Sequence, residues 1–381
     1  MTFFSAITRI LRPASKRQIE AGGGGRRWQG AATLSNPQSS ALAARGPAAA
    51  RAAAAYINAP LANRIVEAWT PALIGRGYQA RSQHPDREVA RRLNSEFEAM
   101  IAAALIPLAR ALVRDGEAFI RIIIADDGGL RLKQIPADLI DPSLSRALDG
   151  GARIIAGTEY DSQEQIVAYH ILGAPFSTFG DAVRVPAADM LHVYDPLFPG
   201  QVRGLSWLAP VLLKLRDRDE ASDALLMQLK TASLMTGFIS DPEGGSAGFD
   251  GDTTGGQVNV SLEPGAMRIL PPGADVKFSN PGQGLAQAVE FLRSQDLEIA
   301  AGVNLTFEML TGNLGEANFS SARVGLQDFR RRAEMLQKSL IEGQFLRPLW
   351  RRWIDIMALA GEIPTDPAAL ADHRTVRFVA P

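Results

Sequence analysis

The sequence contains no cysteine and only four histidines among its 381 residues. The lack of cysteine excludes disulfides, thiolate zinc sites and a cysteine nucleophile. No apolar run reaches the roughly 20 residues needed to cross a bilayer, so no membrane partner is expected. The net charge is −1, from 40 basic and 41 acidic side chains. Proteins that grip nucleic acid are usually basic, so this balance argues against general DNA binding, though not against a protein through which DNA slides.

The histidines and carboxylates form no recognisable metal or catalytic motif. The four histidines, His84, His170, His192 and His373, occur in neither a His-x-x-x-His nor a His-x-x-Glu-His spacing. His192 lies in an apolar run before Asp195, and we interpret it as a structural strand residue. Paired carboxylates occur in turns, on a charged helix or in a glycine-rich segment, whereas a two-metal nuclease needs them on rigid elements. No catalytic residue, cofactor or metal is expected.

The first half of the chain predicts an α+β arrangement after a segment of low complexity. Residues 1–60 are expected to be an N-terminal arm and linker, in which the alanine-rich block 41–55 can be helical. Residues 61–115 show helical spacing of apolar side chains, whereas residues 117–195 switch to short strands. Two of these strands, 118–124 and 130–135, flank a hairpin signal at residues 126–129. Further strands are expected at 153–155, 166–172, 183–185 and 190–193.

Two long helices enclose a smaller segment rich in glycine, proline and aspartate. The first helix is predicted over residues 206–236, with Ser206 as its N-cap, and the second over 284–303. The segment between them, 237–283, contains small strands and a tip with Asp250 and Asp252. The middle of the first helix is charged nearly all round, at Lys214, Arg216, Asp217, Arg218 and Asp219. Such a helix is either solvated or packed against copies of itself through charge pairs.

A polar loop and a long charged helix follow. The loop lies within residues 304–321 and contains Thr311, Gly312, Asn313, Gly315, Glu316, Asn318 and Ser320. It offers no strong metal ligand set and no nucleophile, so it is interpreted as a mechanical element. Ser321 is expected to cap the helix over 322–360, whose arginines Arg330, Arg331 and Arg332 lie outside its apolar stripe. Three interpretations of these arginines stay open: a solvated helix face, salt bridges between subunits, or contacts to DNA phosphates. Residues 361–381 form a tail with weak structural signals.

Three segments together resemble a known family. They are the sequence from Ala300 to Arg323, the segment Asp115-Gly116-Glu117-Ala118-Phe119, and the segment Gln201-Val202-Arg203-Gly204-Leu205-Ser206. In this order and spacing they resemble the lambda-type tailed-phage portal proteins, which gene transfer agents also use. The resemblance covers roughly residues 60 to 360. It does not distinguish a portal protein of a phage from one of a gene transfer agent.

The resemblance implies a portal fold and a structural function. The fold would have an α/β wing (61–205), a two-helix stem (206–236 and 284–303), a small β-rich clip (237–283) and a long helix toward the crown. Typically twelve copies would form a ring at one capsid vertex of the virion, assembled in the bacterial host cytoplasm. Double-stranded DNA would pass non-specifically through the channel during packaging and ejection. Partners would be the terminase large subunit, the head–tail adaptor and the major capsid protein.

The resemblance also places a tunnel loop at residues 311–320, with Glu316 and Asn318 expected to face the channel. Glu316 is the only formal charge in that loop, and it would repel a phosphate rather than hold it. Two other functions stay open from the residues alone. One is a ring-forming head–tail connector without a packaging role, and the other is a nucleic-acid-processing enzyme.

Overall fold

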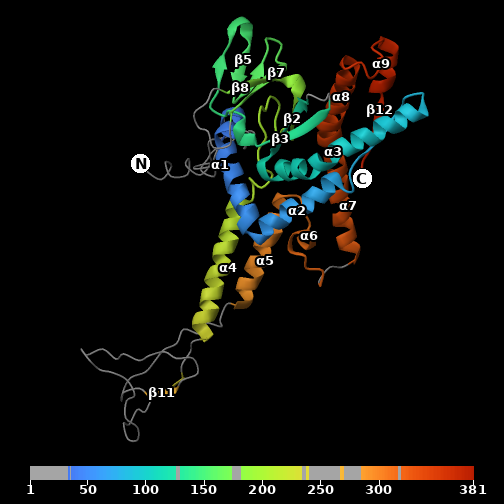
Figure 1. Cartoon of the computed structure of the whole chain (residues 1–381). Helices are drawn as coiled ribbons and strands as arrows, with labels where there is room; N and C mark the ends of the chain where they lie inside the picture. Colours follow the sequence, from blue (N-terminus) through green and yellow to red (C-terminus); the bar gives the residue numbers. More distant parts are fainter. Residues whose placement is uncertain are drawn as a thin grey trace, which may run out of the picture.

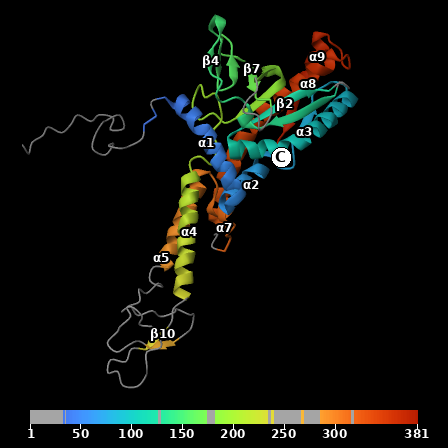
Figure 2. The ribbon, with the colours of Figure 1, turned by 60° about the vertical axis from the view of Figure 1, so that its left-hand side comes forward.

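The computed structural model describes residues 33–34, 36–125, 129–173, 182–233, 237–239, 267–269, 285–315 and 319–381. These residues form a body of helices and small sheets, from which two helices project side by side (Figure 1). Figure 2, turned by 60°, shows the same projecting pair. Within the described residues, no helix is long and apolar enough to cross a membrane.

The helices account for most of the body. They are α1 (Pro37–Asn58), α2 (Pro60–Ile74), α3 (Arg87–Asp115), α4 (Leu212–Ser233), α5 (Leu285–Gly302), α6 (Phe307–Thr311), α7 (Phe319–Leu336), α8 (Arg347–Leu359) and α9 (Pro367–Arg374). A π-helical segment, Gln337–Leu346, joins α7 to α8. The long helix predicted over 322–360 is therefore continuous but changes its hydrogen-bond pattern in the middle.

The strands form small sheets, and those of the body are antiparallel. A three-stranded sheet has the order β3 (Leu130–Ile135), β2 (Glu117–Ile124), β9 (Met190–Tyr194). A five-stranded sheet contains β4 (Arg146–Ala147), β5 (Arg153–Ile155), β6 (Thr158–Tyr160), β7 (Ile166–Ile171) and β8 (Val183–Pro186) in chain order. Outside these sheets, β1 (Gln79–Ser82) pairs with β12 (Val376–Val379), and β10 (Gly237–Ile239) pairs in parallel with β11 (Met267–Ile269). The α+β expectation is confirmed.

The helix α3 shows how the sequence specifies the body. Asp86 caps its N-terminus, because the carboxylate accepts hydrogen bonds from the amides of Glu88 and Val89. Gly116 ends it in the left-handed conformation, with φ of 88°. Between the caps, apolar residues at helical spacing are buried: Leu93, Phe97, Ile101, Leu105, Leu108 and Leu112. The helical spacing predicted for this segment is therefore confirmed.

Aromatic side chains join the layers of the core. Trp69 of α2 lies 5.3 Å from the ring of Trp207 and 4.7 Å from that of Phe329. Its indole N–H donates to the carbonyl of Val303 at 3.0 Å, so the base of the projecting helices is held to α2. Trp350 of α8 likewise packs 4.9 Å from Phe97. One core therefore links α2, α3, α7 and α8.

Three sequence-based expectations differ from the structure. The segment 1–60 contains the packed helix α1, whose Arg45, Ala49 and Ala52 are buried, so this part is not a linker. The helix expected from Ser206 begins at Leu212, because the amides of Ala209 and Val211 bond to carbonyls three residues back and form turns. The weak tail contains α9 and β12, which pairs with β1.

Candidate functional site

The two projecting helices, α4 and α5, pair their charges within one chain. Lys214 of α4 lies 2.8 Å from the carboxylate of Glu298 on α5, and Arg218 lies 3.0 Å from Asp296. Asp296 is only 7% exposed, so its pair with Arg218 is partly shielded from water. From the sequence alone, these charges could belong to a solvated helix or to a helix that pairs its charges with other copies of the chain. The structure instead uses Lys214 and Arg218 to hold α4 against α5.

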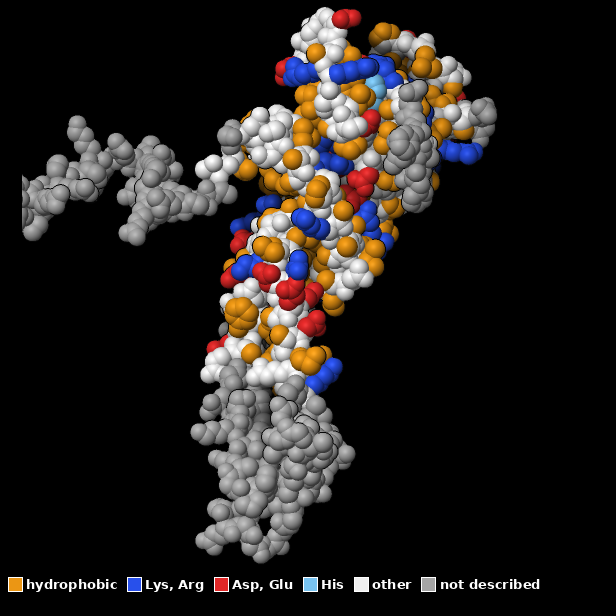
Figure 3. Space-filling view, turned by 90° about the vertical axis from the view of Figure 1, so that its left-hand side faces the viewer, with side chains coloured by type: hydrophobic (Ala, Val, Ile, Leu, Met, Phe, Trp, Pro, Cys, Tyr) orange, Lys and Arg blue, Asp and Glu red, His pale blue; other side chains and the backbone are white. Residues whose placement is uncertain are grey.

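The remaining predicted charges of α4 lie on or near its outer side. Arg216 is exposed and pairs with Glu220 one turn along the same helix, at 2.7 Å. Asp217 is exposed as well, whereas Asp219 is half-buried. Figure 3 shows basic, acidic and apolar side chains interleaved along the described part of the projecting helices. The exposed apolar side chains here include Leu213, Leu226, Met227, Phe291 and Leu297. This mixed surface differs from the uniformly polar face of an isolated solvated helix.

The described part of the polar loop is a compact turn. Gly312 ends α6 with φ of 72°, a conformation that favours glycine. The hydroxyl of Thr311 accepts from the amide of Asn313 at 3.2 Å, and the side-chain oxygen of Asn313 accepts from the amide of Gly315 at 3.0 Å. Leu314 is 73% exposed. The loop's own short polar side chains therefore shape its backbone.

Several predicted residues stand apart from this geometry. Glu316, Asn318, Asp250 and Asp252 lie outside the described residues. Ser320 belongs to the first turn of α7, which begins at Phe319. Ser321 is thus inside the helix, and its predicted role as the N-cap is wrong.

The arginines of α7 point in different directions. Phe329 and Ala333 bury one side of the helix, while Arg330, Arg331 and Arg332 are exposed. Arg331 lies 3.7 Å from Asp328 one turn earlier. Arg332 lines a pocket of about 140 Å³ that Asp195 also lines. The three arginines therefore do not form a single basic patch.

A buried charge cluster, which sequence reasoning missed, joins two of the motif segments. Glu117 of β2 is fully buried, and its carboxylate accepts from Arg203 at 2.8 Å and from the amide of Gly204 at 2.8 Å. Arg203 is 2% exposed, and its remaining N–H groups reach the carbonyls of Ala137 and Ala156, each at 2.8 Å. Nearly every donor of this guanidinium is satisfied, as a buried arginine requires.

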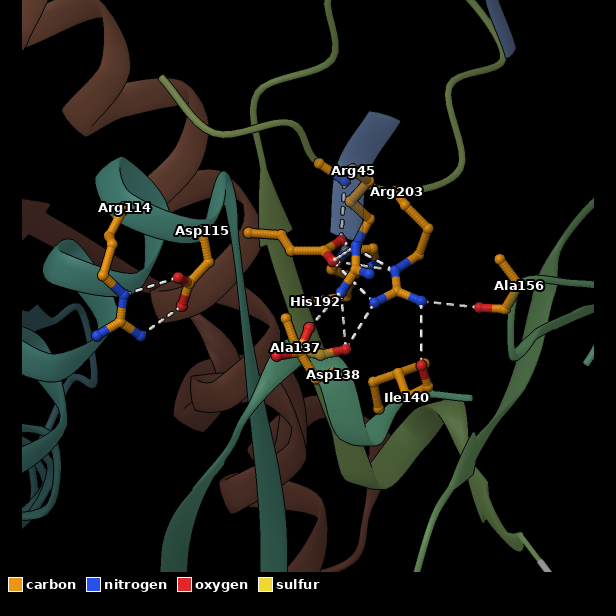
Figure 4. Close-up of polar contacts among 11 residues, drawn as sticks. Arg45, Arg114, Asp115, Ala137, Asp138, Ile140, Ala156, His192 and Arg203 are labelled. Atoms are coloured by element: carbon orange, nitrogen blue, oxygen red, sulfur yellow. Dashed lines mark hydrogen bonds and ion pairs between the residues drawn. The ribbon is translucent and has the colours of Figure 1, made fainter. Parts of the chain in front are cut away.

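Two further side chains complete this cluster. Arg45 of α1 lies 2.6 Å from Glu117, and the Nε2 of His192 lies 3.0 Å from it. Figure 4 shows Arg45, Arg203 and His192 converging from different elements. Burial alone would raise the pKa of Glu117, but Arg203, His192 and Arg45 outweigh it and hold the pKa well below its usual range. Burial lowers the pKa of His192, so the neutral ring donates to the carboxylate.

Glycines bring the two motif segments into direct contact. A Cβ on Gly204 would lie 2.2 Å from the carbonyl oxygen of Gly116, and one on Gly116 would lie 2.1 Å from the carbonyl carbon of Leu205. Neither glycine can be replaced without moving the backbone. The cluster thus fixes the chain between β9 and α4 onto β2, at the root of the projecting helices. A charged residue directly before the apolar strand was the available signal for Glu117, whereas nothing local marked Arg45.

His192 lies in β9, as predicted, and contacts Glu117 rather than Asp195. Its ring stacks 4.1 Å from Phe119 and 4.4 Å from Tyr194. Among the residues that the structure describes, no group of three or more histidines and carboxylates could hold a metal ion. The geometry around His192 is that of a packed, hydrogen-bonded strand residue.

Most of the chain is similar in sequence to known proteins. Residues 24–337 match the family described as phage portal protein, lambda family. The probable portal protein of Halomonas phage phiHAP-1 is 28% identical over 272 residues, which cover 68% of this chain and 52% of the relative. The match thus spans about half the length of that curated relative.

Solved structures show a more distant likeness. The neck of a native gene transfer agent (GTA) particle, computed with C12 symmetry, has a chain with 12% identity and a TM-score of 0.47, covering 86% of this chain and 81% of that one. An HK97 family phage portal protein from Corynebacterium diphtheriae has 10% identity and a TM-score of 0.38, covering 86% of this chain and 94% of that one.

Proposed function

The chain belongs to the lambda family of phage portal proteins, and from this premise we propose that it is a structural portal subunit. Copies of the chain form a ring, typically of twelve, at one vertex of a tailed-phage or gene transfer agent capsid. Double-stranded DNA passes through the ring's channel during packaging and ejection. The protein acts by shape and by contact, without catalysis, and it is a component of the virion that is assembled in the bacterial host cytoplasm.

The projecting pair of helices supports this proposal most directly. The chain leaves the body along α4 and returns along α5, with Lys214–Glu298 and Arg218–Asp296 holding the two together. In the proposed ring α4 and α5 form the stem, and the segment between them forms the clip. At 1.5 Å per residue, the 22 residues of α4 extend roughly 33 Å. Residues 61–205 and the helix over 322–360 form the wing around the stem.

The loop over residues 311–320 is proposed to border the channel. Its described residues, 311–315, end α6 and follow it, and α6 packs against α5 (Figure 1). Its exposed turn at Gly312, Asn313 and Gly315 offers no positive charge that would hold a phosphate. Weak contact of this kind suits a surface past which DNA must slide.

The proposed partners follow from the position at the vertex. The clip meets the terminase large subunit during packaging and the head–tail adaptor afterwards, while the wing contacts the major capsid protein. These partners bind in turn, and the ring itself persists through each stage.

Imaging of the purified full chain tests the proposal. Electron microscopy is expected to show rings with a central channel, a broad wing and a narrow stem, and mass photometry a mass of many subunits. A short ring without a stem would indicate a connector of another kind. A monomer or dimer with metal-dependent nuclease activity would overturn the proposal in favour of an enzyme.

Glu316→Lys tests the loop assignment separately. A lysine at a channel surface would attract phosphates, so packaging or retention of DNA is expected to change. Glu362→Lys, an identical charge change at an exposed residue beyond α8, serves as the control. Normal packaging and retention in both variants would remove residues 311–320 from the channel wall while leaving the ring itself intact.

A further inference from the structure

A small pocket at the junction of the body and the projecting helices contains a carboxylate without a partner. The pocket of about 140 Å³ is lined by Asp195, Trp207, Asn304 and Arg332, among others. It is smaller than the roughly 300–1,000 Å³ of small-molecule sites, so it suits one inserted side chain. Asp195 is half-buried, and within the described residues no hydrogen bond or ion pair reaches its carboxylate.

The charges of this pocket are unsatisfied on both sides. Burial raises the pKa of Asp195, and Arg332 lowers it only in part. Arg332 is exposed, and it forms no ion pair with any residue in the described ranges. Burying a carboxylate without a counter-charge is unfavourable, so the pocket has a negative position and a positive position that the single chain leaves open.

The opposite flank of α7 carries a complementary pair. Arg330 precedes Arg332 by two residues and therefore lies roughly 200° away around the helix. Glu334, one turn beyond Arg330, lies on the same flank. Both are exposed, and within the described residues neither forms an ion pair. Phe329 and Ala333 face the core between the two flanks, so Arg330 cannot reach the Asp195 of its own chain.

We propose that Arg330 and Glu334 of one copy dock against Asp195 and Arg332 of the next copy. The inference rests on the proposed ring and names a contact within it. Arg330 enters the pocket and neutralises Asp195, while Glu334 faces Arg332, so each charge meets its opposite. The indole of Trp207 supplies an aromatic wall for the guanidinium.

The placement of the two pairs on opposite flanks selects a ring over a closed dimer. Each copy presents its pocket on one side and its Arg330–Glu334 pair on the other. Such contacts are heterologous: they repeat head to tail and close when the rotation per copy divides a full turn. DNA is a poor occupant of the pocket, because Asp195 would repel a phosphate.

Charge reversal in the full chain tests the contact. Arg330→Glu and Asp195→Arg are each expected to raise the concentration for half-assembly roughly tenfold or more, because like charges then face each other. The double variant is expected to recover part of the loss, since the pair across the contact is restored with its charges exchanged, while the new charges lie beside the like charges of Arg332 and Glu334. Arg331→Glu is the matched control: it makes the same charge change on the third side of α7, where Asp328 is the neighbour.

Cysteine pairs provide a second measurement, and the chain has no cysteine to interfere. Oxidation of the Asp195→Cys, Arg330→Cys variant is expected to produce a ladder of covalent multimers. Single reversals that assemble no worse than the control, or oxidation that yields only monomers, would overturn the contact. If the parent forms rings under those conditions, only this inference fails. If the parent forms no ring, the proposed function fails first.

Discussion

Replacement of Glu117 is expected to destabilise the fold more than that of any exposed carboxylate. Glu117 balances two guanidinium groups, those of Arg203 at 2% exposure and Arg45 at 4%. Glu117→Gln keeps the shape of the side chain but removes its negative charge. Both guanidinium groups then stay buried without a counter-ion, and the amide N–H groups of the glutamine face the N–H donors that the carboxylate had accepted from. Removing one partner of a buried ion pair costs about 3–5 kcal/mol. At roughly 2 °C per kcal/mol for a large domain, the melting temperature should fall by about 6–10 °C.

Thermal unfolding of the full chain, followed by circular dichroism, measures this effect. Glu164→Gln is the matched control, since it removes one carboxylate from the exposed pair with Arg153 at 2.8 Å. That pair should contribute less than about 1 kcal/mol. Arg45→Met should lie between the two, because Arg203 still neutralises the carboxylate.

The pH dependence of the same variant gives an independent check. The folded pKa of Glu117 is depressed, while its unfolded pKa is ordinary, about 4.3. Its stabilisation is therefore complete above about pH 4.3 and declines as pH falls toward the folded value. The gap between the parent and Glu117→Gln should narrow below that pH. A variant no less stable than Glu164→Gln, or a gap that stays constant down to pH 3, would refute the assignment of this cluster as a structural lock.

Other predictions concern His192 and the projecting helices. Burial holds the folded pKa of His192 below its ordinary value of about 6.5. As pH drops through that value, the unfolded chain takes up the proton before the folded one, so the free energy of unfolding falls. Replacing the ring by His192→Gln should therefore flatten the change in melting temperature between pH 7 and pH 5. Arg218→Gln should cost about 1–3 kcal/mol in urea unfolding because Asp296 loses its partner, whereas Arg216→Gln, on the exposed face, should cost less than about 0.5 kcal/mol; equal losses would contradict the intrachain pairing. A Cβ on Gly302 would lie 2.4 Å from a methyl of Val211, so Gly302→Val should lower the melting temperature by several degrees, and the added substitution Val211→Ala should recover part of the loss.

Local patterns predicted those elements whose stability is mostly local. The apolar spacing of α3 and the two strands β2 and β3 were predicted from adjacent residues, and the structure contains the helix and pairs the two strands antiparallel. The strand β1 was not predicted, because it is only four residues long and pairs with β12 near the other end of the chain. Short strands depend on their partners, and a single local window cannot contain both.

The candidate sites divide in the same way. The charged positions of α4 were identified from the sequence, but their pairing with Glu298 and Asp296 depends on how α5 returns beside it. Arg45 lies in an alanine-rich run that resembles a linker, and its role appears only when α1 packs near β2. The relation of residues 311–320 to a channel depends on contacts between copies, which no local pattern of one chain specifies.

The π-helical stretch between α7 and α8 has a consequence for evolution of the chain. A π turn is closed by a hydrogen bond five residues along the chain instead of four, so it accommodates about one more residue than an α turn. The flanking α8 is anchored by Trp350, whose indole N–H donates to the carbonyl of His373. Homologues that lack one residue within 337–346 can therefore adopt α-helical hydrogen bonding there, while α7 and α8 keep their packing against the core. Alignments of this family should show single-residue gaps within 337–346 more often than elsewhere between the start of α7 and the end of α8.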